Sequence, residues 1–168
     1  MRPNRGFTLV ELLVVIAVIA VLAGIGYPVT RSFIAKSHEA ACIGNLRSLG
    51  VALQSYLQEH NQIMPELAIG RASKTEDVAV LDTVLLPYLD SPEVFHCPAD
   101  KDDFKKTGSS YVWNSSQNNR PISDLYFFNV REDLIPLIFD GKSRHPSGTN
   151  FLYADFRSSN KPRFVTGN

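Results

Sequence analysis

The sequence has no charged side chain between Glu11 and Arg31, although charged residues make up 20% of the chain. The uncharged interval belongs to an apolar segment, residues 7–27, that would form a helix of roughly 30 Å. That length is enough to cross the hydrocarbon core of a bilayer. Inserting a carboxylate into a membrane within such a segment costs roughly 2.5–3.5 kcal/mol on insertion scales. We therefore expect Glu11 to have a charged partner or a functional role.

Neither sign of charge is in excess, because 17 lysines and arginines balance 17 aspartates and glutamates. A chain without a basic surplus shows no electrostatic footprint for nucleic acid, and we expect no nucleic-acid partner. The sequence also lacks internal repeats and low-complexity tracts. Its 168 residues therefore fit one domain of moderate size plus the apolar segment.

Cysteine is scarce, with two residues in the whole chain. The basic residues Arg2 and Arg5 precede the apolar segment, which places the N-terminus in the cytoplasm by the positive-inside rule. Residues after about Pro28 are then expected in the periplasm or outside the cell, where oxidation is possible. Because Cys42 and Cys97 both fall in that part, we predict a disulfide between them. Two separately buried thiols are the alternative.

The segment RGFTLVELLVVI, residues 5–16, resembles the N-terminal processing site of type IV pilins and type II secretion pseudopilins. The resemblance implies that a prepilin peptidase cuts after Gly6 and then methylates the new amine of Phe7. It also implies that Glu11 is the acidic residue used in assembly, where it would meet the amine of a neighbouring subunit. Pro28 takes the place of the family's helix-kinking proline.

Two other interpretations of the apolar segment are open. An ordinary secretory signal would be cut after small residues, and the Val-Leu-Ala sequence at residues 21–23 could serve. A plain signal anchor would stay uncut. Both interpretations leave Glu11 in the apolar core without a partner, so we prefer prepilin processing.

A helix is expected to continue past the membrane to about residues 60–61, where Pro65 excludes further extension. Its apolar residues beyond Pro28 recur at offsets of three and four and make one stripe, whereas polar residues such as Glu39 fall mostly off it. The stripe consists of Phe33, Cys42, Leu46, Leu49, Leu53, Tyr56 and Leu57. We expect this stripe to pack on a head domain.

The head combines a short second helix, around residues 80–89, with several strand candidates. The strands are expected at residues 110–113, 137–140 and 151–154, with a fourth candidate at 163–165 and turns between them. The fold class is therefore α+β and pilin-like, with a long N-terminal helix on a small antiparallel sheet.

The expected organisation divides the chain into four parts. They are a prepilin leader (1–6), a transmembrane and filament-core helix (7–27), its amphipathic continuation (28–61) and a globular α+β head (62–168).

Three further segments resemble major-pseudopilin-like proteins with a C-terminal His-x9-Asp-Gly motif: residues 42–65, 94–100 (VFHCPAD) and 145–155 (HPSGTNFLYAD). His145 and Asp155 keep that spacing, but Phe156 replaces the glycine. Glycine would permit a positive φ, which phenylalanine resists, so we expect the turn after Asp155 to differ. The late cysteine pair of many adhesive type IV pilins is also missing, which favours a pseudopilin.

Two sets of polar residues imitate enzyme sites. His38, Glu39 and Cys42 have the spacing of a zinc-protease helix, but no third ligand is evident. Ser147 has His145 nearby in sequence but lies in a Pro-Ser-Gly turn without the Gly-x-Ser-x-Gly elbow of a hydrolase. We therefore predict that the protein is not an enzyme.

His145 and Asp155 are expected instead to tie neighbouring strands together. Calcium is the alternative, since some major pseudopilins bind it in C-terminal loops. Asp140 and Asp155 would be its ligands, although their spacing shows no recognisable pattern. No other cofactor is expected.

The sequence is thus interpreted as a structural pseudopilin of a type II secretion-like filament. Expected partners are copies of itself and other pseudopilins in a helical filament, the prepilin peptidase, an inner-membrane assembly platform, and lipid before assembly. The expected location is the inner membrane, with the head periplasmic, and later a filament in the cell envelope. The alternatives are a type IV pilus subunit for adhesion, motility or DNA uptake, and a membrane-anchored periplasmic binding domain.

Overall fold

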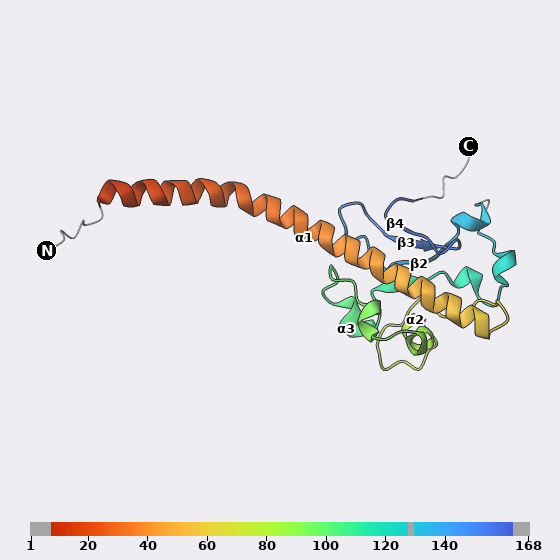
Figure 1. The fold of residues 1–168 in the computed structure, drawn as a ribbon. Helices are drawn as coiled ribbons and strands as arrows, with labels where there is room; N and C mark the ends of the chain where they lie inside the picture. Colours follow the sequence, from red (N-terminus) through yellow and green to blue (C-terminus); the bar gives the residue numbers. More distant parts are fainter. Residues whose placement is uncertain (1–7, 128–129, 163–168) are drawn as a thin grey trace. The chain divides into compact units, whose positions relative to one another are not determined.

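The computed structural model describes residues 8–127 and 130–162. The chain forms two compact units, Met1–Ala35 and Lys36–Asn168. One helix, α1 (Leu9–Glu59), contributes to both units. In the second unit, the remaining elements gather around the part of α1 that is drawn in orange to yellow (Figure 1).

Helix α1 ends close to the predicted position, for a reason visible in the backbone. Asn61 and Gln62 both adopt positive φ, 54° and 61°, a conformation that cannot continue a right-handed helix. The Gln62 N–H donates to the Leu57 carbonyl (2.8 Å), which satisfies one of the final carbonyls of α1. Position 28 lies inside the continuous helix, and a kink at Pro28 stays a prediction.

The head contains one antiparallel sheet in the order β1-β2-β3-β4. Its strands are β1 (Tyr111–Trp113), β2 (Pro136–Asp140), β3 (Phe151–Tyr153) and β4 (Ser158–Ser159). Val112 pairs with Phe139, and Phe139 in turn pairs with Phe151 across the next strand boundary. The predicted α+β, pilin-like fold is confirmed.

The strand β4 was not predicted. The predicted strand at residues 163–165 lies outside the described residues, and β4 falls in a stretch, residues 158–162, that was expected to be a turn. Ser158 pairs with Leu152, so β4 forms by tertiary pairing with β3. Two serines have neither the β-branched shape nor the alternation that marks a strand.

The other elements are short. They are α2 (Leu81–Leu85), α3 (Asp103–Thr107) and the 3₁₀ turns η1 (Leu86–Tyr88), η2 (Pro92–Phe95), η3 (Ser115–Gln117), η4 (Ile122–Asp124) and η5 (Glu132–Leu134). The expected second helix thus divides into α2 and η1, because Pro87 favours the first turn of a new helical segment.

The core lies between the apolar stripe of α1 and the inner face of the sheet. Leu46, Leu49 and Leu53 of the stripe are fully buried, as are Trp113 of β1 and Leu152 of β3. Burying each such leucine stabilises the fold by about 1.5–3 kcal/mol. The stripe was predicted to begin too early, because Phe33 is 69% exposed and the buried part begins at Cys42.

Candidate functional site

The first turn of α1 holds Glu11 in a reciprocal set of hydrogen bonds with Thr8. The backbone N–H and the hydroxyl of Thr8 both donate to Glu11 Oε2, at 2.8 and 2.7 Å. The Glu11 N–H points back to the Thr8 hydroxyl oxygen (3.3 Å). This is a capping box, and it keeps the carboxylate at the positive end of the helix dipole. Gly6 and Phe7, the predicted processing residues, lie outside the described residues.

The segment that follows Glu11 offers an almost continuous apolar surface. Its large apolar side chains from Leu9 to Leu22 are 46–78% exposed in the isolated chain. Among the described helices, α1 is long and apolar enough to cross a membrane by length and composition. A surface of this kind requires lipid or neighbouring apolar helices.

A disulfide fixes the head to α1. Cys42 of α1 is bonded to Cys97, in the turn after η2, with a Cα–Cα distance of 5.1 Å. Both residues are fully buried. The bond closes a loop of 55 residues that contains about the last third of α1, together with α2, η1 and η2.

His145 reaches the disulfide from the loop between β2 and β3. Its Nε2 atom lies 3.3 Å from Cys97 Sγ and 3.6 Å from Asp140 Oδ2. Burial raises the pKa of the Asp140 carboxyl to about 6. The Asn150 N–H donates to this carboxylate at 2.9 Å and lowers the pKa, but burial has the larger effect. Burial lowers the pKa of His145. At neutral pH the contact is therefore between an imidazole and a carboxylate rather than an ion pair.

Glu39 is buried, although the sequence pattern placed it off the apolar stripe. Its carboxylate accepts hydrogen bonds from the Ser147 hydroxyl and from Asn160 Nδ2, the latter at 3.0 Å. Both partners come from the C-terminal part of the head, which no periodicity within α1 could reveal. Because Ser147 is bound to Glu39, it does not form the imagined hydrolase set with His145.

Asp155 and Phe156 form the turn between β3 and β4. Asp155 Oδ1 accepts the Arg157 N–H (3.0 Å), and the Phe156 N–H donates to the Tyr153 carbonyl (2.8 Å). Phe156 adopts φ 58°, the left-handed conformation that glycine permits, so the reason for expecting a different turn does not hold. Its ring packs against the hydrophobic core, which offsets the cost of the left-handed backbone.

The two residues of the His-x9-Asp motif contact different parts of the head. His145 lies against the disulfide, whereas Asp155 closes the β3–β4 turn. Within residues 8–127 and 130–162, the single group of three metal-ligating side chains is Cys42, Cys97 and His145. Neither calcium candidate, Asp140 or Asp155, belongs to that group.

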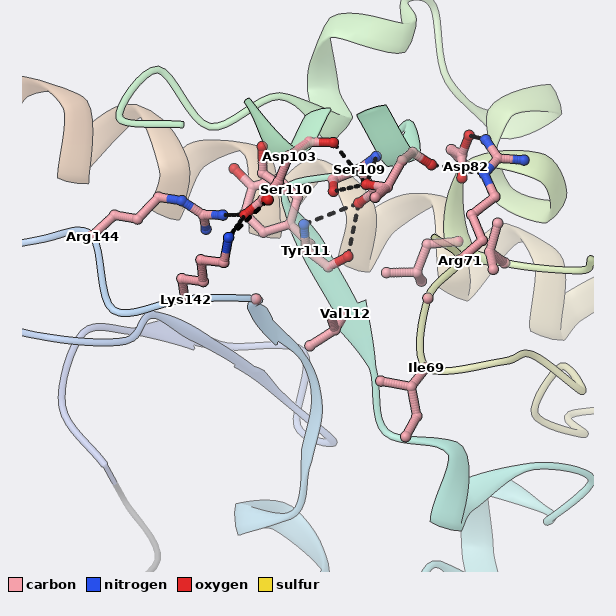
Figure 2. Close-up of a pocket in the computed structure, with 15 residues that line it drawn as sticks. Ile69, Arg71, Asp82, Asp103, Ser109, Ser110, Tyr111, Val112, Lys142 and Arg144 are labelled. Atoms are coloured by element: carbon pink, nitrogen blue, oxygen red, sulfur yellow. Dashed lines mark hydrogen bonds and ion pairs between the residues drawn. The ribbon is translucent and has the colours of Figure 1, made fainter. Parts of the chain in front are cut away.

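A pocket of about 170 Å³ lies between α2, β1 and the loop after β2. Figure 2 shows that its cations face carboxylates: Arg71 binds Asp82, while Lys142 and Arg144 converge on Asp103. Lys142 Nζ lies 2.8 Å from Asp103. Charges matched in this way give little net attraction for a charged ligand. The pocket was not predicted, because its residues are distant in sequence.

Comparisons with known proteins find similarity to pilus proteins over part of the chain. Residues 1–27 match the family described as "Prokaryotic N-terminal methylation motif". The chain is 34% identical over 83 residues to Fimbrial protein Q of Moraxella bovis, covering 49% of this chain and 52% of that protein. It is 41% identical over 59 residues to the type IV major pilin protein PilA of Myxococcus xanthus, covering 35% and 27%. No solved structure is significantly similar.

The chain spans about half or less of the length of these curated relatives. Their names are those of type IV pilins and fimbrial proteins, so they favour the pilus alternative over a pseudopilin. These names are those of structural proteins, which agrees with the prediction of a structural protein rather than an enzyme.

Proposed function

We propose that this protein is the structural subunit of a type IV pilus-like filament. The observation that carries the proposal is the methylation-motif match at residues 1–27, which includes the exposed apolar start of α1. In the membrane the helix is surrounded by lipid. In the filament the helices of neighbouring subunits replace that lipid, so the same apolar surface serves both states.

Processing prepares the subunit for this exchange. A prepilin peptidase cuts after Gly6 and methylates Phe7, as the resemblance implies. The new amine then neutralises the Glu11 carboxylate of a neighbouring subunit where water is scarce. Before assembly, the capping box with Thr8 supplies Glu11 with hydrogen-bond donors inside its own chain.

The proposal is tested by expressing the chain with a prepilin peptidase and an assembly platform. Intact-mass analysis should find a chain that begins at methylated Phe7, and electron microscopy should find filaments that contain it. A mature N-terminus at Gly24, or an unprocessed Met1, would refute the processing step. Processed protein that stays monomeric in the membrane would refute the filament.

A secretion pseudopilin is the second candidate, and the cysteines favour it. The chain's two cysteines join α1 to the head. Because Cys42 and Cys97 are bonded to each other, they do not enclose a C-terminal loop, as the late cysteine pair does in many adhesive type IV pilins. Deleting the gene distinguishes the candidates, because loss of surface filaments supports a pilus and loss of a secreted protein supports a secretion filament.

A further inference from the structure

Three atoms of metal-ligand type lie close together at the disulfide, and a fourth lies beside the histidine. Cys42 Sγ, Cys97 Sγ and a ring nitrogen of His145 all lie within 4.8 Å of one another, and all three residues are buried. Asp140 Oδ2 lies 3.6 Å from His145 Nε2. We propose that the reduced form of this protein binds one divalent cation of the zinc type at Cys42, Cys97, His145 and Asp140.

Two of the present distances are close to those of such a site. Zinc bonds of about 2.3 Å to sulfur and about 2.0–2.2 Å to nitrogen or oxygen give a tetrahedron with S–N edges of roughly 3.5 Å and N–O edges of roughly 3.4 Å. The corresponding distances here are 3.3 Å, from Cys97 Sγ to His145 Nε2, and 3.6 Å, from His145 Nε2 to Asp140 Oδ2. The two sulfurs, which are bonded in the oxidised protein, must separate after reduction.

The donor set selects the class of metal. Two thiolates and an imidazole favour zinc and other borderline or soft cations, whereas calcium and magnesium prefer oxygen ligands. A Cys₂HisAsp set also supplies enough negative charge to neutralise a divalent cation in a buried position.

The cluster is polar but incompletely satisfied without a metal. Asp140 Oδ1 and His145 Nδ1 are buried and have no hydrogen-bond partner among the described residues. Buried polar atoms without partners are costly, and a bound cation would compensate the carboxylate directly. The four residues come from α1, the turn after η2, the end of β2 and the following loop. A metal would therefore link the same segments as the disulfide.

The disulfide and the bound cation cannot be present together, because both use the sulfur atoms of Cys42 and Cys97. A phosphine reductant cleaves the S–S bond, takes one oxygen from water to become a phosphine oxide, and leaves two thiols. Binding of the cation then releases both thiol protons, and the two thiolates donate their electron pairs to the metal. Dissolved oxygen, which takes two electrons from the thiolates and two protons to become hydrogen peroxide, re-forms the S–S bond and releases the cation.

Cobalt(II) is a suitable probe, because its spectrum reports both thiolate ligands and tetrahedral geometry. Full-length protein in detergent micelles is reduced with a phosphine, freed of reductant without oxygen, and titrated with cobalt(II). One equivalent should give a sulfur-to-cobalt charge-transfer band that zinc abolishes by displacement. The oxidised protein should give no such band.

Matched variants assign the ligands. His145→Gln should weaken cobalt binding by about 100-fold or more, and Asp140→Asn by at least about 10-fold, while Cys42→Ser should remove the two-thiolate spectrum. His96→Gln is the control, because His96 stacks on Phe104 and lies outside the cluster. Its affinity should equal that of the wild type.

Three results would overturn the site. They are a reduced wild-type protein without the charge-transfer band, a His145→Gln variant with wild-type affinity, and an Asp140→Asn variant with wild-type affinity. If reduction unfolds the head, far-ultraviolet circular dichroism measures the loss of helix content and its recovery when zinc is added. Recovery of helix content on adding zinc supports the site, and failure to recover counts against it.

Discussion

The Glu39 carboxylate accepts a hydrogen bond from the hydroxyl of Ser147, 108 residues further along the chain. The contact joins α1 to the loop before β3, and Asn160 strengthens it from beyond β4. A hydrogen bond to a buried charged group contributes about 1.5–3 kcal/mol. Glu39 therefore fixes the C-terminal part of the head to the helix.

Replacing Glu39 should loosen that part of the head. Glu39→Leu removes the acceptor of both bonds and should lower the free energy of unfolding by about 2–3 kcal/mol. Glu39→Gln keeps one acceptor oxygen and should cost less. Chemical denaturation of the full chain in micelles measures both values. Equal losses for the two variants would show that packing, not hydrogen bonding, is responsible.

Removing the disulfide should destabilise the head substantially. Closing a loop of 55 residues is worth about 4 kcal/mol in the chain-entropy model. The double variant Cys42→Ser/Cys97→Ser should show that loss in denaturation experiments. Alkylation under denaturing, non-reducing conditions checks the bond itself. Labelling of both cysteines in protein taken directly from the cell envelope would show that it is absent.

Phe156 allows the cost of a left-handed backbone to be measured separately from packing. Phe156→Ala and Phe156→Gly both remove the ring, but only glycine tolerates φ 58° without strain. The glycine variant should therefore be more stable than the alanine variant, by about 1–2 kcal/mol. Thermal unfolding of the pair tests this, and a more stable alanine variant would contradict the assigned backbone conformation.

Glu11 should act in assembly rather than in insertion. Glu11→Leu removes a carboxylate that is costly in lipid, so cleavage and membrane residence should stay intact. Filaments should be absent, because the neighbouring amine loses its partner. Mass analysis and electron microscopy of the same cells separate the two effects. Normal filaments from this variant would refute the pairing of Glu11 with an amine.

Acid should weaken the head through Asp100. Burial alone would raise the pKa of this carboxyl, but the Ser110 hydroxyl and the N–H groups of Asp103, Phe104 and Asp102 outweigh it and lower the pKa. A lowered pKa means that Asp100 becomes protonated at a lower pH in the folded state than in the unfolded state. The stabilisation is thus complete above about pH 4 and is lost as the pH falls through the lowered value.

The acid effect is checked by measuring the free energy of unfolding against pH for the wild type and for Asp100→Asn. The variant should be less stable at neutral pH and should lose less stability on acidification. Parallel curves for the two proteins would exclude Asp100 as the source of the acid sensitivity.

Helix α1 and the strands β1, β2 and β3 could be predicted, because the sequence patterns that indicate them lie within each segment. The leucine stripe of α1 reports burial through its own periodicity, and β2 is a short apolar run between turn residues. The capping box of Thr8 and Glu11 was also readable from the spacing of the two residues, although it was overlooked.

The parts that failed depend on tertiary contacts. Glu39 is polar and lies off the stripe, and its burial follows from partners in a distant loop. β4 exists because β3 offers an open edge, and the approach of His145 to Cys97 is set by the sheet. No pattern within a single segment encodes these relationships.

The bond between Cys42 and Cys97 also changes how the subunit would respond to mechanical force. Tension applied to the N-terminal part of α1 passes from Cys42 directly to Cys97 through a covalent link. The 55-residue loop between them would otherwise extend by up to roughly 190 Å, but it bears no load while the bond is intact. A pulled subunit could therefore lengthen only through the residues outside that loop.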